Sequence, residues 1–194
     1  MFEYRLGDLV NLPFHITKPW AVCTHMPESI GCEYMKLQSK LNMTRTRNHD
    51  LLEEIVRKRV APAREAFVAV HIRLGDTLDK PPYSYWCRRV YTKGCLYAYP
   101  PHFYEELHLP RLPIVIYTSI DKGMQGKAAH RSQAFLTNVS QVLRPATIHM
   151  RRQPDHDFLD MMSATILVAH ARGGQFASLL RRIAPRFNVT VLPR

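Results

Sequence analysis

The feature that most constrains the fold is a series of short apolar runs that begins near residue 65 and continues to the C-terminal end. The runs are rich in β-branched residues and are continuous rather than alternating, which is typical of strands buried on both faces of a parallel sheet. They are FVAVHIR (67–73), PIVIYTS (113–119), ATIHM (146–150), TILVAHA (165–171) and NVTVL (188–192). The pattern predicts five strands.

Stretches with helical spacing lie before and between these runs. Helices are predicted over 50–60, with Asp50 as N-cap, and over 124–143, 155–163 and 175–183. Because parallel neighbours are joined by right-handed crossovers, strands and helices in this order predict an α/β fold, a Rossmann-like doubly wound parallel sheet. We therefore expect a Rossmann-like domain over 65–194 and a short N-terminal extension, or remnant of another domain, over 1–64.

The chain is basic, with 27 Lys and Arg against 16 Asp and Glu and a net charge of +11. Such a charge attracts polyanions, although the positive residues are scattered and most are expected to be solvated surface. Nucleic-acid binding is disfavoured, because the sequence has neither a basic and aromatic stripe nor zinc-ligand spacing. The phosphate-binding signatures G-x-x-x-x-G-K-[ST] and G-x-G-x-x-G and the nucleophile elbow G-x-S-x-G are also missing.

Two features indicate an oxidising compartment. Sequons for N-glycosylation begin at Asn42, Asn138 and Asn188. The cysteines form two local pairs whose spacings suit small disulfide loops, Cys23 with Cys32 and Cys87 with Cys95. Chance sequons and reduced thiols are the alternative, and a metal site is disfavoured because neither pair has C-x-x-C spacing. We expect the lumen of the Golgi or endoplasmic reticulum, although the N-terminal residues lack the apolar core of a signal peptide and no run is apolar and long enough to span a membrane.

The segment VAVHIRLGD (68–76) carries the strongest candidate site. Alternation along the strand puts His71 and Arg73 on one face, at the end where parallel sheets bind ligands, and Asp76 follows the turn at Gly75. An arginine there offers a rigid, two-pronged donor that matches the oxygens of a phosphate. A structural Arg–Asp pair at a strand end is the alternative interpretation.

Three segments, in order, carry a resemblance to a known family. HIRLGD (71–76) resembles the H-x-R-R-x-D motif of the fucosyltransferase superfamily, which forms α1,2- and α1,6-linkages and includes protein O-fucosyltransferases. IVIYTSID (114–121) resembles the family's strand that ends in a Ser/Thr-x-Asp turn. DFLDMMSATILVAHARGGQFASLL (157–180) resembles its helix, strand and small-residue turn. Together these segments cover roughly residues 65–192.

The resemblance implies the donor-binding half of a GT-B-like, inverting, metal-independent glycosyltransferase. It implies GDP-fucose as the donor substrate, no cofactor, and a glycan or glycoprotein as the acceptor. Arg73 matches the arginine on the donor β-phosphate, His71 a residue beside the guanosine, and Asp157 the acceptor of the guanine N–H groups. The resemblance places Asp121 in the donor site as well.

Two positions depart from the family pattern. Leu74 replaces the second arginine of the motif, and Arg172-Gly173-Gly174 replaces the usual Ser or Thr after the fourth strand. Amides of Gly173 and Gly174 at a helix N-terminus still suit a phosphate. Asp76 is a candidate general base by position. The alternative function is a catalytically inactive remnant that binds a nucleotide or a glycan.

Overall fold

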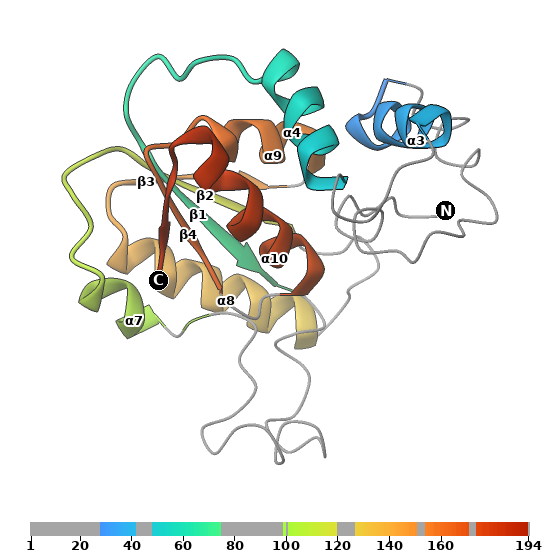
Figure 1. Ribbon diagram of the computed structural model, residues 1–194. Coiled ribbons are helices and arrows are strands. Elements are labelled where there is room, and N and C mark those ends of the chain that lie inside the picture. The colour runs from blue at the N-terminus through green and yellow to red at the C-terminus, as the bar shows by residue number, and fades with distance from the viewer. Residues whose placement is uncertain are drawn as a thin grey trace, which may run out of the picture.

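The computed structural model describes residues 28–41, 48–74, 99, 101–119, 127–150, 154–170 and 174–193. In chain order the helices and strands are α3 (Ile30–Leu41), α4 (Asn48–Arg59), β1 (Val68–Arg73), α7 (Pro101–Glu106), β2 (Ile114–Ser119), α8 (Lys127–Val142), β3 (Ala146–Met150), α9 (Pro154–Met162), β4 (Ile166–Ala169), α10 (Gly174–Ile183), the 3-10 helix η2 (Ala184–Phe187) and β5 (Thr190–Leu192). Figure 1 shows their arrangement.

The five strands form one sheet, in the order β3-β2-β1-β4-β5, and all neighbouring pairs are parallel. The predicted α/β fold with a Rossmann-like parallel sheet is therefore confirmed. Within the sheet, β1 is the first strand in the chain. The strands β2 and β3 follow on one side of it, and the chain then crosses back so that β4 lies on the other side of β1. The order of the strands thus reverses between β1 and β4, and in such sheets ligands bind outside the carboxyl ends of the strands at this point.

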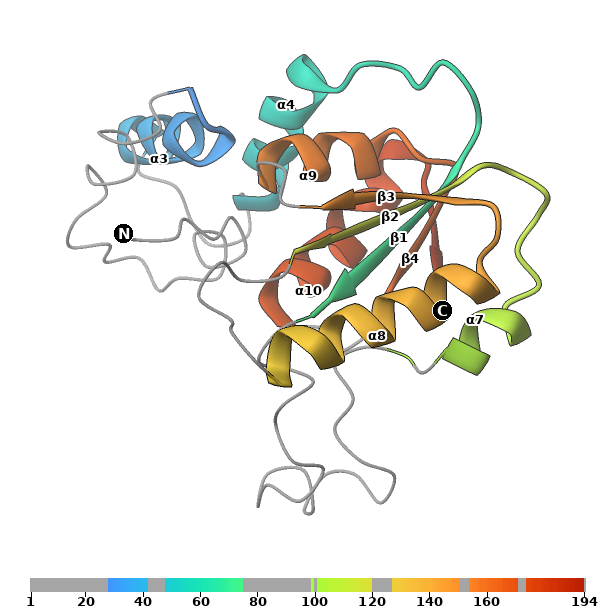
Figure 2. The same cartoon turned by 180° about the vertical axis from the view of Figure 1, so that it is seen from behind.

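Helices cover both faces of the sheet, as Figure 2 shows for α7 and α8 on one side and α4 and α9 on the other. Residues alternate between the faces along β1: Val68, Val70 and Ile72 belong to the core under α7 and α8, whereas Ala69 belongs to the core under α3, α4, α9 and α10. Both cores are apolar, which explains why the strands read as uninterrupted apolar runs in the sequence.

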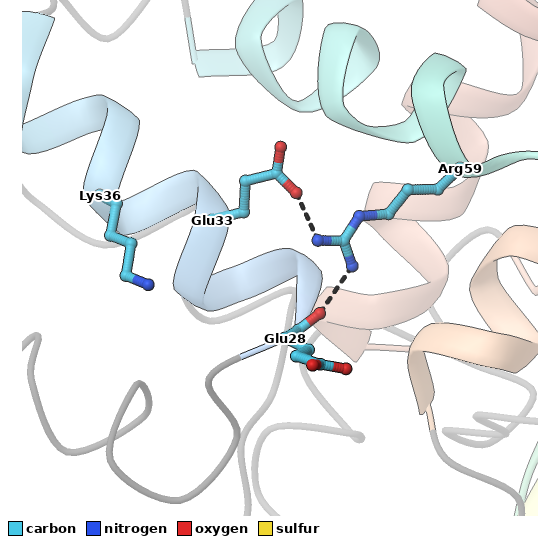
Figure 3. A pocket seen from close by; sticks show the side chains of 4 residues that line it. All are labelled: Glu28, Glu33, Lys36 and Arg59. Carbon is cyan, nitrogen blue, oxygen red and sulfur yellow. Dashed lines mark hydrogen bonds and ion pairs between the residues drawn. The ribbon is translucent and has the colours of Figure 1, made fainter.

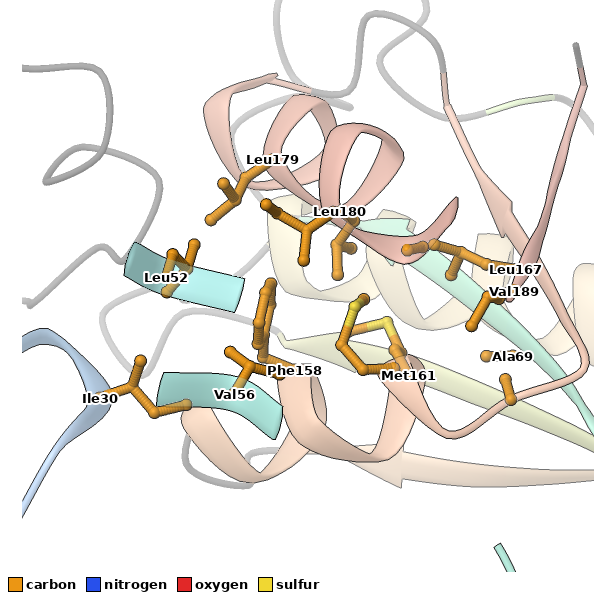
Figure 4. Close-up of a cluster of buried hydrophobic side chains, with 14 of the residues drawn as sticks. Ile30, Leu52, Val56, Ala69, Phe158, Met161, Leu167, Leu179, Leu180 and Val189 are labelled. Atoms are coloured by element: carbon orange, nitrogen blue, oxygen red, sulfur yellow. The ribbon is translucent and has the colours of Figure 1, made fainter. Parts of the chain in front are cut away.

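The N-terminal helices share the larger of these cores. Ile30 and Tyr34 of α3 and Leu52 of α4 are fully buried, together with Phe158 of α9 and Leu180 of α10. Figure 4 shows these helices converging on Phe158. Both helices come from the stretch expected to form an N-terminal extension, and they share this core with α9, α10 and buried strand residues such as Ala69.

Asp155, in the first turn of α9, joins α3 to the sheet domain. Its Oδ2 accepts a hydrogen bond of 2.8 Å from the amide of Ile30, the first residue of α3. The hydroxyl of Ser29 accepts a second hydrogen bond, of 3.1 Å, from the amide of Cys32. Because the first amides of a helix have no partner within it, these two acceptors fix where α3 begins.

Charged side chains join α4 to η2. Arg186 of η2 donates to Glu53 at 2.8 Å and also to Asp50. Arg57 donates to Glu53 and to the carbonyl of Arg186, and its guanidinium lies 4.8 Å from the centre of the Phe187 ring. Since η2 ends two residues before β5, this network connects α4 to the edge strand of the sheet.

The predicted elements match the observed ones closely, with two exceptions. The helix predicted over 50–60 begins at Asn48, so Asp50 lies in its first turn and the prediction of an Asp50 N-cap is wrong. The helices α3, α7 and η2 were not predicted. Within the part of the chain that the structure describes, every helix is too short or too polar to cross a membrane.

Candidate functional site

The candidate site lies at the carboxyl end of the sheet, where β1 and β4 are neighbours. His71 and Arg73 end β1, and His71 is opposite Ala169, the last residue of β4. Helices α9 and α10 follow β3 and β4, so their N-terminal ends lie at the same edge. These ends carry the positive pole of the helix dipole, which favours bound anions. The fold therefore gathers an arginine, a histidine and two helix N-termini at this edge.

His71 is half-buried and contacts the helix that follows β4. Its ring centre lies 5.2 Å from that of Phe176 in α10, and Phe176 lies 6.1 Å from Phe158 in α9. Burial, and then the positive charge of Arg73, lower the pKa of His71 to about 4. His71 is therefore neutral at physiological pH and offers one N–H donor and one nitrogen acceptor.

Arg73 is half-buried and lies on the same face of β1 as His71. Because they are two residues apart on the strand, their side chains are neighbours on that face. The intervening Ile72 points to the opposite face, where it is buried, and its carbonyl accepts a hydrogen bond of 2.8 Å from the hydroxyl of Thr118 in β2. This bond holds the ends of β1 and β2 together and fixes the backbone that carries Arg73.

Two further predicted site residues belong to the helix N-termini. Asp157 is half-buried in the first turn of α9, next to Phe158 in the chain. Gly174 is the first residue of α10. The Phe158–Phe176 contact brings α9 and α10 together near His71. Asp76, Asp121 and Gly173 lie outside the described residues.

A second group of aromatic side chains flanks β4 on the other face of the sheet and was not predicted. His170, directly after β4, lies 4.1 Å from Tyr99 between ring centres, and Tyr99 stacks on Phe103 of α7 at 3.8 Å. Burial, and then the charge of Arg181, lower the pKa of His170. The sequence signal was the position of His170 at a strand end, but its partners come from a distant segment.

Arg181 has a structural role at the same edge. Its guanidinium donates to two carbonyls. One belongs to Ala169, the last residue of β4, at 3.0 Å, and the other to Pro193, the residue after β5, at 2.8 Å. In the sequence, Arg181 is one of many scattered basic residues expected at the surface. It is instead half-buried and ties α10 to the ends of two strands.

The remaining predicted residues concern disulfides and glycosylation. Cys32 is disulfide-bonded. Cys23, Cys87 and Cys95 lie outside the described residues, so the pairing of Cys32 with Cys23 stays a prediction. Asn138 is exposed within α8, and Asn188 is exposed directly after η2 with φ of 62°. Asn42 lies outside the described residues.

Away from the sheet edge, α3 and α4 enclose an open cavity of about 450 Å³ that is lined by Glu28, Glu33, Lys36 and Arg59 (Figure 3). Arg59 donates to the carbonyl of Glu28 at 2.7 Å and forms an ion pair with Glu33. Among the described residues, no three His, Cys, Asp or Glu side chains gather closely enough to hold a metal ion. Sequence analysis did not predict this cavity.

No known protein family, curated protein or solved structure matches the chain. The function therefore has to be inferred from the chemistry of the residues themselves.

Proposed function

We propose that the chain is the nucleotide-sugar-binding part of a glycosyltransferase that resembles the fucosyltransferase superfamily, with GDP-fucose as donor. The proposed enzyme is GT-B-like, inverts the anomeric carbon and needs no metal. The observation that carries the proposal is the position of Arg73 and His71 on β1, beside the point where the strand order reverses. Both residues belong to the segment that resembles the family motif.

The diphosphate is the part of the donor that this edge suits best. Negative charge grows on the leaving diphosphate as the bond to the sugar breaks. The guanidinium of Arg73 can donate two parallel hydrogen bonds to phosphate oxygens, and the amides that open α10 at Gly174 add uncharged donors. Donors fixed in advance stabilise developing charge most effectively, and one such donor is typically worth about 3–4 kcal/mol in the transition state.

The guanine base would lie toward α9. A carboxylate such as Asp157 can accept from both the N1–H and the amino group of guanine, and adenine lacks this pair of donors. Neutral His71 contributes a hydrogen bond without adding charge. This arrangement predicts that GDP binds more tightly than ADP.

The experiment is a calorimetric titration of the full chain with GDP, GDP-fucose, UDP and ADP, with wild type compared with Arg73→Ala. Loss of the charged donor should weaken GDP binding at least tenfold, or by about 1.5–3 kcal/mol, and leave the fold intact. Arg111→Ala is the matched control, because Arg111 is exposed and comes just before β2, at the opposite edge of the sheet.

The proposal fails if wild type does not bind GDP, or if both variants bind it equally well. Release of GDP from GDP-fucose in the presence of glycan acceptors then separates an active transferase from an inactive remnant. Thermal melts of both variants show whether any loss of binding comes from unfolding.

A further inference from the structure

We infer that the outer edge of β3 is a docking site for an extended, acidic segment of another protein, which adds to the sheet as a further strand. β3 is the uppermost strand in Figure 2 and the first in the strand order, and among the described residues it pairs with β2 alone. Alternate N–H and C=O groups of β3 point away from β2. Such a row of backbone groups is what an extended polypeptide recognises, because it offers the same groups at the same spacing.

The two edges of the sheet are protected to different degrees. At the β5 edge, Arg181 donates to the carbonyls of Leu192 and Pro193, and the proline that follows the strand has no N–H to offer. β3 has five residues against three in β5, and its sequence ATIHM contains neither Pro nor Lys, the residues that commonly block an edge. Pro145 comes directly before β3, so pairing is limited to β3 itself. β3 is therefore the edge that suits an added strand.

Ile148 gives this edge an apolar contact. It is level with Ile116 of β2, so both side chains point to the face of the sheet that α8 covers. Ile116 is fully buried, whereas Ile148 is 38% exposed and is the exposed one among the large apolar side chains that the structure describes. An apolar side chain of an added strand would lie beside Ile148 and bury it.

The charge around β3 selects an acidic segment. Arg144 is exposed two residues before β3, and its side chain has no ion-pair partner within the described part of the chain. Helix α8, on the same face as Ile148, contains no Asp or Glu. The whole chain carries a net charge of +11. Acidic side chains at the end of a docked segment can pair with Arg144, and a basic segment would be repelled.

The same charge disfavours a second copy of the chain as the occupant. Two copies related by a two-fold axis would pair their β3 strands antiparallel. With the two Ile148 side chains opposite each other, Arg144 of one copy lies level with residue 152 of the other, which is also an arginine. Like charges directly opposite each other destabilise a pair of strands. A different protein with acidic residues therefore fits the edge better.

The test is a titration of the isotope-labelled full chain with the synthetic peptide DDTVTVTDD, followed by amide chemical shifts. We expect saturable shifts at residues 146–150 and slower hydrogen exchange at alternate amides of β3. The same peptide with alternate backbone amides N-methylated lacks the donors for pairing and should give no saturable shifts. A peptide with Lys in place of every Asp should bind at least about tenfold more weakly.

Variants of the chain separate the charge from the apolar contact. Arg144→Gln should weaken binding of the acidic peptide about threefold, as expected for one exposed ion pair. Ile148→Thr keeps a β-branched residue in the strand and should also weaken binding about threefold, because it removes apolar area. The matched control is Arg182→Gln. Arg182 is exposed on α10, which packs against β4 on the other side of β1, so this variant should bind like wild type.

Several results would overturn the inference. They are the absence of saturable shifts at β3 in wild type, equal binding of the acidic peptide and either altered peptide, and equal loss of affinity in Arg144→Gln and Arg182→Gln. Protection of the outward amides of β3 without peptide would also overturn it, because another part of the chain then covers the edge. Shifts at β3 that depend on protein concentration alone would do the same, because a second copy then occupies the edge.

Discussion

His71 links the candidate site to stability through its protonation. Its pKa is about 4 in the folded protein and near 6.5 for an exposed histidine, so the unfolded chain binds a proton more readily. The stability contributed by neutral His71 is therefore complete above pH 6.5 and is lost as the pH falls from 6.5 toward 4, by up to about 3 kcal/mol. Urea unfolding at a series of pH values should show this slope in wild type and a smaller slope in His71→Gln.

A matched control is His102→Gln, which removes an exposed imidazole from α7. It should keep the wild-type slope between pH 6.5 and 4. If His71→Gln and His102→Gln behave alike, the ring of His71 is not shielded as its contact with Phe176 indicates.

At the scale of single residues, alternation along a strand predicted how two of the candidate site residues are placed. It put His71 and Arg73 on one face of β1, and both lie there, because the side-chain period of a strand does not depend on the rest of the fold. The contacts of His170 and Arg181 could not be predicted in this way. Tyr99 reaches His170 across 71 positions of sequence, and Arg181 binds carbonyls at the ends of two different strands.

At the scale of elements, α3 depends on one carboxylate from another helix. Asp155 is buried, and its Oδ2 accepts the amide that opens α3, while no described group donates to its Oδ1. Asp155→Ala leaves the Ile30 amide buried without an acceptor and should cost about 1–3 kcal/mol. Asp155→Asn keeps an acceptor oxygen and should cost less. Urea unfolding measures both, and hydrogen exchange should show the loss of protection centred on α3.

The pH dependence of stability in wild type and Asp155→Asn separates the effect of the Asp155 charge from that of its hydrogen bond. Burial raises the pKa of Asp155 above its usual value, against the opposing effects of the Ile30 amide and Arg59. The stability that Asp155 contributes is therefore complete at low pH and falls as the pH rises through its folded pKa. The difference between wild type and Asp155→Asn should shrink as the pH rises, and a difference that grows would contradict this account.

The elements that sequence analysis found and missed differ in where their stability comes from. Strands β1 to β5 are marked by their own apolar runs, since both faces are buried. Helix α7 has only six residues, too few for a periodic pattern to be recognised. Helix α3 begins where it does because of Ser29 and of Asp155, which lies 125 positions away, and such a partner leaves no local signal.

For the whole molecule, the central question is whether the two faces of the sheet unfold together. Each face has its own core, but both cores are built on the same strands: Ala69 belongs to one and Val70 to the other. Losing either core would expose one face of β1, and the helices on the opposite face would then have no stable sheet to pack on. We therefore expect one cooperative transition.

Phe158→Ala and Leu136→Ala test this expectation from opposite faces, since both side chains are almost completely buried. We expect losses of about 3–5 kcal/mol for Phe158→Ala and about 2–5 kcal/mol for Leu136→Ala. In each variant, urea transitions followed by far-UV and near-UV circular dichroism should coincide. If Leu136→Ala instead separates the two transitions, the core under α7 and α8 unfolds on its own. In that case His170 and Tyr99 would detach from the sheet edge while His71 and Arg73 stay in place, so nucleotide binding would survive the first transition.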